Sequence, residues 1–143
     1  VNGERVCRAA ASMWARIGVR VNLNVMRYPP YMARFINNQS DVFIMGWANT
    51  PQLDGFSILN NVLHTRTQQR GSWNAGRYSL PEFDALIARA AAEMDLNRRT
   101  ALMTEAFGIE RREFWTIPLY REPMVVAMRR PFEMPASPDG RMR

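Results

Sequence analysis

The sequence predicts an α/β fold in which a β-α-β unit is followed by amphipathic helices. Apolar and polar residues alternate through residues 19–25, a pattern typical of a half-buried strand. The apolar run at residues 41–46 has the length of a buried strand, and Pro29 and Pro30, between the two segments, suit the first turn of a helix. Because a short crossover implies parallel strands joined by a right-handed connection, this order predicts a β-α-β unit.

A helix is predicted before the first strand, over residues 3–17. Its apolar residues recur at helical spacing along one face: Val6, Ala10, Met13 and Ile17. Gly18 is expected to end this helix. The helix between the two strands is expected to end at Asn37 and Asn38, and its buried side carries Tyr31, Phe35 and Ile36.

A further helix is predicted to begin near Asp54, which is a plausible N-cap. Its inward-facing residues form an amphipathic set: Phe56, Leu59, Val62 and Leu63. Periodicity is then lost over residues 65–76, which predicts a long polar loop. A loop of this length in a compact domain is often functional or mobile.

Two longer amphipathic helices are predicted after this loop. Ser79 and Glu82 match a capping box at the start of the first, whose buried face carries Phe83, Leu86, Ile87, Ala90 and Met94. Asp95 or Asn97 is expected to cap the second, which runs to about Phe114 and turns inward Leu102, Met103, Ala106 and Phe107.

The end of the chain is predicted to be less regular. Residues 116–120 and 125–128 are expected to be extended, although Pro118 makes an inner strand position unfavourable. Residues 131–143 form a tail rich in Pro and Arg that folding need not order. Residues 1–130 are therefore assigned to the folded part of the chain.

The length of 143 residues suits one domain with a real core. The sequence starts at Val1 and lacks a charged-then-apolar signal segment, so we expect a chain cut from a longer protein. No apolar run approaches the roughly 20 residues that span a bilayer, so an integral membrane protein is not expected.

All 19 basic residues are Arg, and the net charge is +6. This usage fits either a genome-wide codon bias or selection for anion recognition. The charge motivates an alternative function, a basic interaction module that binds polyanions or an acidic protein partner. The basic residues are dispersed among apolar and acidic ones, however, and no nucleic-acid-binding motif is present, so no nucleic acid is expected as a partner.

The residue types that most enzymes need are scarce. Cys7 is the only cysteine and His64 the only histidine, and neither belongs to a metal-binding spacing or a nucleophile motif. Carboxylates are scattered rather than paired, and there is no Gly-rich phosphate loop. We therefore predict a protein that is not an enzyme and that has no catalytic residues, metal or cofactor.

The candidate site lies where the second predicted strand ends in Gly46 and Trp47. In open α/β sheets, ligands bind at the carboxyl edge of the strands, in the crevice formed by the loops that leave it. Trp47 fits a cleft-lining position or a core aromatic that seals the strand end. Trp73, in the long loop, fits a ligand-stacking role or a role in pinning the loop to the core. Asp54 fits a helix cap or a ligand contact.

The order of motifs resembles the carboxyl-terminal part of the family 5 extracellular solute-binding proteins, the peptide-type receptors of bacterial ABC importers. The resemblance rests on M-W-A-R-I-G-V-R-V at residues 13–21, Y-x-x-x-F at 31–35, D-V-F-I-M-G-W at 41–47, R-Y-S-x-P-E-F-D-A-L-I at 77–87 and W-T-I-P-L at 115–119. It implies a partial lobe of the type II periplasmic-binding-protein fold. It also implies a periplasmic or extracellular receptor that captures a small or peptide solute between two lobes and delivers it to a membrane permease.

The resemblance also implies where the solute binds. One wall of the cleft corresponds to Gly46, Trp47, Ala48, Asn49 and Thr50, and we add Asp54 and Trp73 as ligand-binding candidates. Peptide-binding members commonly have an Asp that pairs with the ligand's amino group where this chain has Thr50, which makes a free peptide amine a doubtful ligand. Surfaces that a missing lobe leaves uncovered would favour self-association.

Overall fold

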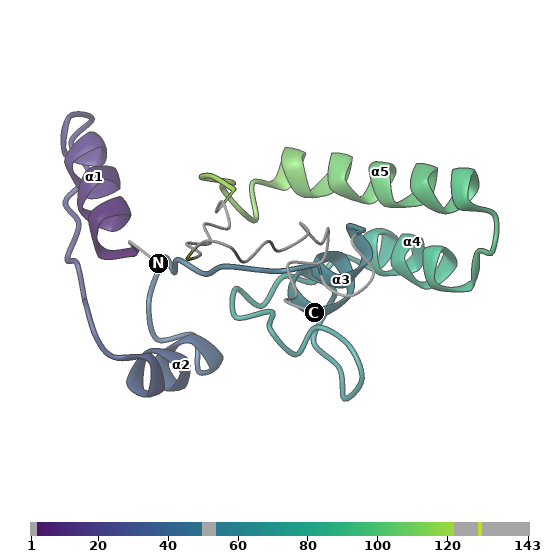
Figure 1. The fold of residues 1–143 in the computed structure, drawn as a ribbon, viewed down its shortest axis with the longest axis horizontal. Helices are drawn as coiled ribbons and strands as arrows, with labels where there is room; N and C mark the ends of the chain where they lie inside the picture. Colours follow the sequence, from purple (N-terminus) through teal and green to yellow (C-terminus); the bar gives the residue numbers. More distant parts are fainter. Residues whose placement is uncertain (1–2, 50–53, 122–128, 130–143) are drawn as a thin grey trace. The chain divides into compact units, whose positions relative to one another are not determined.

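The computed structural model describes residues 3–49, 54–121 and 129. These residues fall into two compact units that separate between Gly46 and Trp47. The first unit carries α1 and α2, and the second carries α3, η1, α4 and α5 (Figure 1). The predictions for Thr50, for an extended segment at 125–128 and for the tail at 131–143 lie outside the described residues.

Helix α1 (Gly3–Ala15) opens the first unit, as predicted. The chain leaves it at Gly18, which has a φ of +85° that glycine adopts at little cost, and the Val19 N–H donates to the Trp14 carbonyl at 3.0 Å. No residue of α1 is buried, and Met13 is 64% exposed. The apolar face that the sequence predicts is therefore present, but it is not covered.

Helix α2 (Tyr28–Ile36) carries prolines in its first turn and ends at Asn37, as predicted. Its buried residue Phe35 packs edge-on against Phe43, with ring centroids 5.2 Å apart. The Tyr31 hydroxyl donates to the Ile44 carbonyl at 2.7 Å. These contacts attach the segment after α2 to the helix itself.

The α/β class and the β-α-β unit are not confirmed, because the described residues contain no β-strand. Residues 19–25 and 41–46 are drawn as coil without strand arrows (Figure 1). Alternation fixes which side chains share a face, but a strand also needs a neighbour for its backbone hydrogen bonds. The apolar side of residues 19–25 is largely exposed to solvent, with Val19 46%, Val21 38% and Val25 52% exposed.

The second unit begins with a short helix that widens. Helix α3 (Phe56–Ile58) continues into the π-helical turn η1 (Leu59–Leu63), which ends with the His64 N–H donating to the Leu59 carbonyl at 2.9 Å. Three of the predicted inward residues are buried here: Leu59, Val62 and Leu63. The sequence pattern therefore predicts which residues face the core, but not the π-helical geometry.

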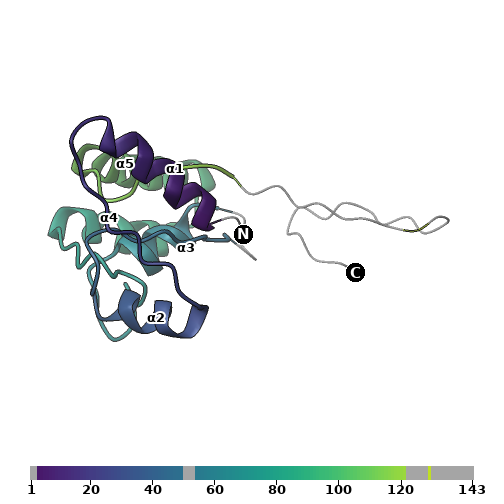
Figure 2. The same ribbon diagram turned by 90° about the vertical axis from the view of Figure 1, so that its left-hand side faces the viewer.

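Helices α4 (Pro81–Ala92) and α5 (Leu96–Glu113) pack side by side and enclose most of the core of this unit (Figure 1 and Figure 2). Their buried apolar residues are Phe83, Leu86, Ile87, Ala90, Met103, Ala106 and Ile109. Met94 was predicted to face inward but is 90% exposed, because α4 ends before it. The prediction of two amphipathic helices is confirmed.

The two predicted caps differ in outcome. Asp95 caps α5 as predicted, since its side chain accepts a hydrogen bond from the Arg98 N–H at 2.9 Å. The capping box at Ser79 is wrong, because Leu80 is the N-cap of α4 and makes no side-chain cap bond. Ser79 instead accepts a hydrogen bond from the Thr65 hydroxyl at 3.1 Å. Pro81 at the first helical position has no N–H, which removes one of the donors that the start of a helix leaves unsatisfied.

The loop between η1 and α4 is hydrogen-bonded to η1 at several points. The Gly71 N–H donates to the Asn60 carbonyl and the Trp73 N–H to the Asn61 carbonyl, each at 2.9 Å. Gly71 has a φ of +63°. The loop that the sequence predicted as long and polar thus follows η1 closely, and this brings Trp73 to a fixed place beside it.

The chain turns sharply after α5. Phe114 adopts the left-handed conformation at a φ of 53°, and the next residue, Trp115, stacks on Tyr78 with ring centroids 5.1 Å apart. The buried carboxylate of Glu110 accepts hydrogen bonds from the Thr116 N–H at 3.1 Å and the Thr116 hydroxyl at 2.5 Å. These contacts hold the start of the final described segment against α5.

Candidate functional site

Two tryptophans from different segments meet in the second unit. Trp47 follows the predicted strand end and Trp73 lies in the long loop, yet their rings pack edge to face with centroids 5.8 Å apart and an interplanar angle of 71°. Both side chains are half-buried. Aromatic pairs of this geometry are favourable beyond the area they bury. The structure therefore joins two of the residues that the sequence singled out for the site.

The orientation of Trp47 is fixed by α3. Its indole N–H donates to the Ser57 hydroxyl at 3.2 Å, and the Ser57 carbonyl accepts a hydrogen bond from the Asn61 amide at 2.9 Å. The polar end of Trp47 is therefore already satisfied. What this indole offers a ligand is its apolar surface.

Asp54 has two structural partners. Its Oδ1 accepts a hydrogen bond from the Phe56 N–H at 3.0 Å, next to the start of α3, and its Oδ2 forms an ion pair with Arg99 of α5 at 3.0 Å. The Arg99 guanidinium also lies 4.9 Å from the centre of the Phe56 ring, at cation–π distance. The N-cap of α3 is Gly55, so the prediction of Asp54 as the N-cap is wrong by one residue; Asp54 instead accepts the Phe56 N–H from the preceding position and links this segment to α5.

Asn49 is a polar residue of the candidate wall whose side-chain oxygen lacks a partner. Its Oδ1 is buried and accepts no hydrogen bond. Neighbouring Ala48 is exposed. Gly46, the last residue of the first unit, is also exposed, and a Cβ built on it would meet nothing within 4 Å. The Asn49 oxygen is therefore unpaired but closed to solvent.

The single histidine has a structural environment. His64 is buried, and its Nδ1 lies 2.7 Å from the Thr65 carbonyl and 3.4 Å from Asp84 Oδ1. The same Asp84 oxygen accepts the Thr65 N–H at 3.0 Å. The cluster joins the end of η1 to Asp84 of α4.

No group of three or more His, Cys, Asp or Glu residues suited to a metal ion occurs in the described parts of the chain. Likewise, no helix there is both long enough and apolar enough to cross a membrane.

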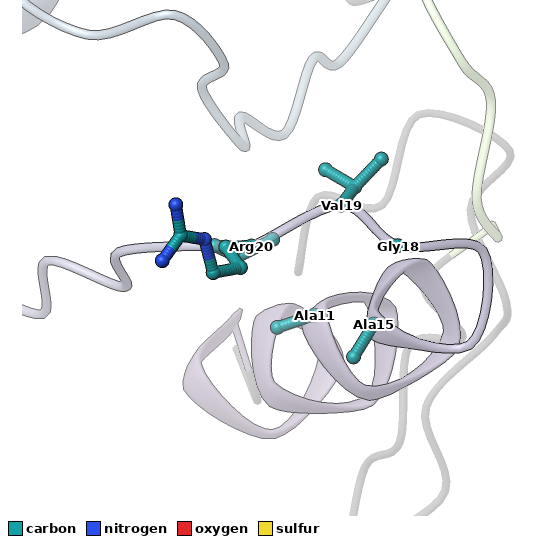
Figure 3. A pocket seen from close by; sticks show the side chains of 6 residues that line it. Ala11, Ala15, Gly18, Val19 and Arg20 are labelled. Atoms are coloured by element: carbon teal, nitrogen blue, oxygen red, sulfur yellow. The ribbon is translucent and has the colours of Figure 1, made fainter.

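The first unit contains a hollow of about 460 Å³ beside α1 (Figure 3). It is lined by Ala11, Ala15, Gly18, Val19, Arg20 and Val21. Figure 3 shows Ala11 and Ala15 on the helix, with the segment that carries Gly18, Val19 and Arg20 passing beside them. None of the predicted site residues lines it, and Arg20 is its one charged residue, so it offers few groups that could orient a solute.

The site residues that the sequence named therefore differ in their roles. Trp47 and Trp73 come together, Asn49 carries an unpaired acceptor, and Asp54 is engaged by protein groups. Thr50 lies outside the described residues. The sequence did not reveal that Arg99 pairs with Asp54. Arg99 lies in a segment of mixed charges, and the spacing of those charges along the chain does not indicate a distant partner.

Comparison with known proteins gives partial similarities. No family model and no solved structure matches the chain. It is 29% identical over 121 residues to the periplasmic oligopeptide-binding protein OppA of Escherichia coli, which covers 82% of this chain and 21% of that protein. It is 26% identical over 123 residues to the probable deoxycholate-binding periplasmic protein YgiS of the same species, covering 85% and 22% respectively.

A third similar protein is the oligopeptide-binding protein OppA of Mycobacterium tuberculosis, 28% identical over 116 residues, or 80% of this chain and 19% of that protein. The chain thus spans about a fifth of the length of the curated relatives it matches. These relatives are solute-binding proteins by name, and two of them are periplasmic. The similarity agrees with the family resemblance and does not favour a polyanion-binding module.

Proposed function

We propose that this chain is part of a periplasmic receptor of the family 5 type, which captures a small solute and delivers it to the permease of an ABC importer. The main support for the proposal is the contact between the Trp47 and Trp73 rings. The sequence predicted both residues as ligand-site candidates, although they lie in separate segments. It is supported by similarity to oligopeptide- and solute-binding proteins over about four-fifths of the chain.

In this proposal, residues 46–50 and Trp73 form part of one wall of an interlobe cleft. Extended solutes bind such walls through backbone groups, while pockets and aromatic surfaces add selectivity. The half-buried indoles would pack against apolar parts of the solute. The names of the relatives include an oligopeptide binder and a probable deoxycholate binder, so the solute class is peptides or other small molecules with an apolar surface.

The proposal also accounts for the extended segments of the first unit. Residues 1–130 would be a portion of a longer receptor, and residues 19–25 and 41–46 would join its sheet. The exposure of Val19, Val21 and Val25 supports this, because alternating valines suit a strand with one covered face. The same uncovered surfaces would make the isolated chain self-associate.

The alternative of a basic module that binds polyanions or an acidic protein is less well supported. Several arginines already have acidic partners: Arg8 pairs with Glu4, Arg98 with Glu93 and Arg99 with Asp54. Each pair reduces the charge available to an anionic partner. Binding to a polyanion that falls steeply with salt would revive this alternative.

The test is a thermal melt of the full-length protein with a mixed library of short peptides and other small solutes. A solute whose free concentration is 100 times its dissociation constant stabilises the native state by about 2.7 kcal/mol. A receptor should therefore show a clear rise in melting temperature with one solute class. Trp73→Ala should reduce this shift. Trp14→Ala, which changes a half-buried tryptophan outside the candidate site, should not.

The proposal would be overturned if no solute shifts the melt and cells that lack the protein import normally. A solute shift that persists unchanged in Trp73→Ala would keep the receptor function but remove Trp73 from the site.

A further inference from the structure

The rings of Trp47 and Trp73 form one edge-to-face pair in the second unit. We infer that Arg99 of α5 is a positioning residue for this tryptophan pair, acting through Asp54 and the start of α3. The inference rests on the proposed function for the role of the pair in holding a solute. It follows from a continuous set of contacts that runs from α5 to α3 and from there to both tryptophans.

Both tryptophans are hydrogen-bonded to the helix formed by α3 and η1. The Trp47 indole N–H donates to the Ser57 hydroxyl at 3.2 Å. The Trp73 backbone N–H donates to the Asn61 carbonyl at 2.9 Å. The Asn61 side-chain amide in turn donates to the Ser57 carbonyl at 2.9 Å, so the two points of attachment are joined to each other. A rotation of this helix would therefore change the place of both tryptophans.

The end of this helix explains why the loop attaches there. A helix leaves its last carbonyls without partners inside the helix. Here the loop N–H groups of Gly71 and Trp73 supply the partners of two consecutive carbonyls of η1. Turns of π-helix occur frequently at functional sites. The loop, and Trp73 with it, is therefore fixed to the end of the helix.

Helix α5 holds the beginning of α3. Arg99 pairs with Asp54 Oδ2 at 3.0 Å, and the other oxygen of Asp54 accepts the Phe56 N–H at 3.0 Å. The guanidinium also lies 4.9 Å from the centre of the Phe56 ring. Phe107, further along α5, lies so close to Gly55 that a Cβ added there would be 2.6 Å from its ring. The position of this helix start is therefore set by α5.

The contact made by Arg99 is directional. Its guanidinium meets one carboxylate oxygen and one ring, and together these restrict how α3 can rotate. The contact of Phe107 with Gly55 limits only how closely the two helices approach. Loss of the guanidinium should therefore loosen the rotation of α3, and with it the geometry of the tryptophan pair, while the helices stay packed.

The first readout is the ultraviolet circular dichroism of the full-length protein, because two indoles in contact couple and give a signal that neither gives alone. The native spectrum minus that of Trp73→Phe isolates the signal of the pair. Arg99→Met should lose most of this signal at a temperature where the variant is folded, and Arg99→Lys should lose less. Arg98→Met, which removes a guanidinium that is 73% exposed, should retain it.

The hydrogen bond between Ser57 and Trp47 gives a second pair of variants. Ser57→Ala removes the acceptor of the indole N–H and should also lose most of the pair signal. Ser57→Thr keeps a hydroxyl and should restore it. A general loss of stability would not separate these two variants, since the signal is measured on folded protein.

The second readout is isothermal titration of the full-length protein with the solute that raises its melting temperature most, taken from the library of short peptides and small molecules. Arg99→Met and Ser57→Ala should each weaken binding about three- to tenfold, the loss that one misplaced contact causes. Arg98→Met and Ser57→Thr should bind as the native protein does.

A pair signal that is unchanged in Arg99→Met would overturn the inference and leave the receptor function standing. So would an equal loss in Arg98→Met. Solute affinity that is unchanged in Arg99→Met, despite a lost pair signal, would overturn the link between this positioning and solute binding. If no solute binds the native protein, the proposed function fails, and the spectra still decide whether Arg99 positions the pair.

Discussion

Asn74 and Tyr78 are joined by two hydrogen bonds: the Asn74 amide donates to the Tyr78 carbonyl at 2.8 Å, and the Tyr78 N–H donates to Asn74 Oδ1 at 3.0 Å. The same amide donates to the His64 carbonyl at 3.0 Å. Asn74 is only 1% exposed. A single side chain thus holds both ends of the loop between η1 and α4, and this loop carries Trp73 towards Trp47.

We predict that Asn74→Ala lowers the free energy of unfolding by about 2–4 kcal/mol, because it leaves buried backbone groups at both ends of the loop without partners. Urea denaturation measures the loss. Asn97→Ala, at an exposed position of α5, should change the free energy of unfolding by less than about 0.5 kcal/mol. Equal effects of the two changes would show that Asn74 does not hold the loop.

We predict opposite effects for alanine at two glycines of the second unit. At Gly71, a Cβ would lie 2.3 Å from the His64 carbonyl oxygen and the φ is +63°, so Gly71→Ala should cost about 2 kcal/mol or more. At Gly108, within α5, the nearest atom to an added Cβ is Arg112 Nη1 at 3.8 Å. Gly108→Ala should therefore stabilise by about 0.5–1 kcal/mol, through helix propensity.

Thermal or urea unfolding of the two alanine variants gives this comparison directly. Stabilisation by Gly71→Ala would contradict the observed close approach of the loop to η1. Destabilisation by Gly108→Ala would mean that α5 is packed more tightly at this point than the open space beside the glycine indicates.

Helices could be predicted from the sequence because their determinants are local. Proline in a first turn, Asp95 as a cap and Gly18 as a stop act within a few residues of their own positions, and the structure confirms each of them. The buried face of α4 also follows from spacing alone. The error at Ser79 arose because its hydroxyl has a distant partner, Thr65, that no local motif reveals.

The strands were predicted from a pattern that does not specify a partner. Residues 19–25 alternate as a strand would, but a ladder requires a second segment, and no such pairing occurs among the described residues. Local sequence could assign Val19 and Val21 to one face of a strand. It could not supply the neighbour that would make the segment part of a sheet.

The candidate site was predictable only in part, for a similar reason. Trp47 and Trp73 were each identified as aromatics in ligand-site positions, but their contact depends on the path of the loop along η1, which is set by backbone hydrogen bonds from Gly71 and Trp73. The pairing of Asp54 with Arg99 depends on how α5 packs, and charge spacing along the chain does not encode it.

We predict that Arg99→Met lowers the free energy of unfolding by about 1–2 kcal/mol, since it removes the ion pair with Asp54 and the cation over Phe56 while keeping an apolar stem. The cost should shrink as salt is added, because the pair is partly exposed. Arg98→Met, which removes a guanidinium that is 73% exposed, should cost less than about 0.5 kcal/mol. A salt-independent loss in Arg99→Met would point to packing instead.

We predict a loss of stability at alkaline pH that depends on Tyr78. Burial raises the pKa of its phenol above the ordinary value of 10.0, and the nearby Glu110 carboxylate raises it further. The unfolded chain therefore releases this proton first, so the contribution of the neutral phenol is fully present below about pH 10 and is lost as the pH rises through the folded pKa. Tyr78→Phe should flatten the fall of the urea midpoint between about pH 9 and pH 11.

At pH 7 the same change should still reduce stability, because the hydroxyl donates to the Trp115 carbonyl at 2.5 Å. An alkaline slope that is identical with and without the hydroxyl would show that Tyr78 ionises as freely in the folded protein as in the unfolded chain.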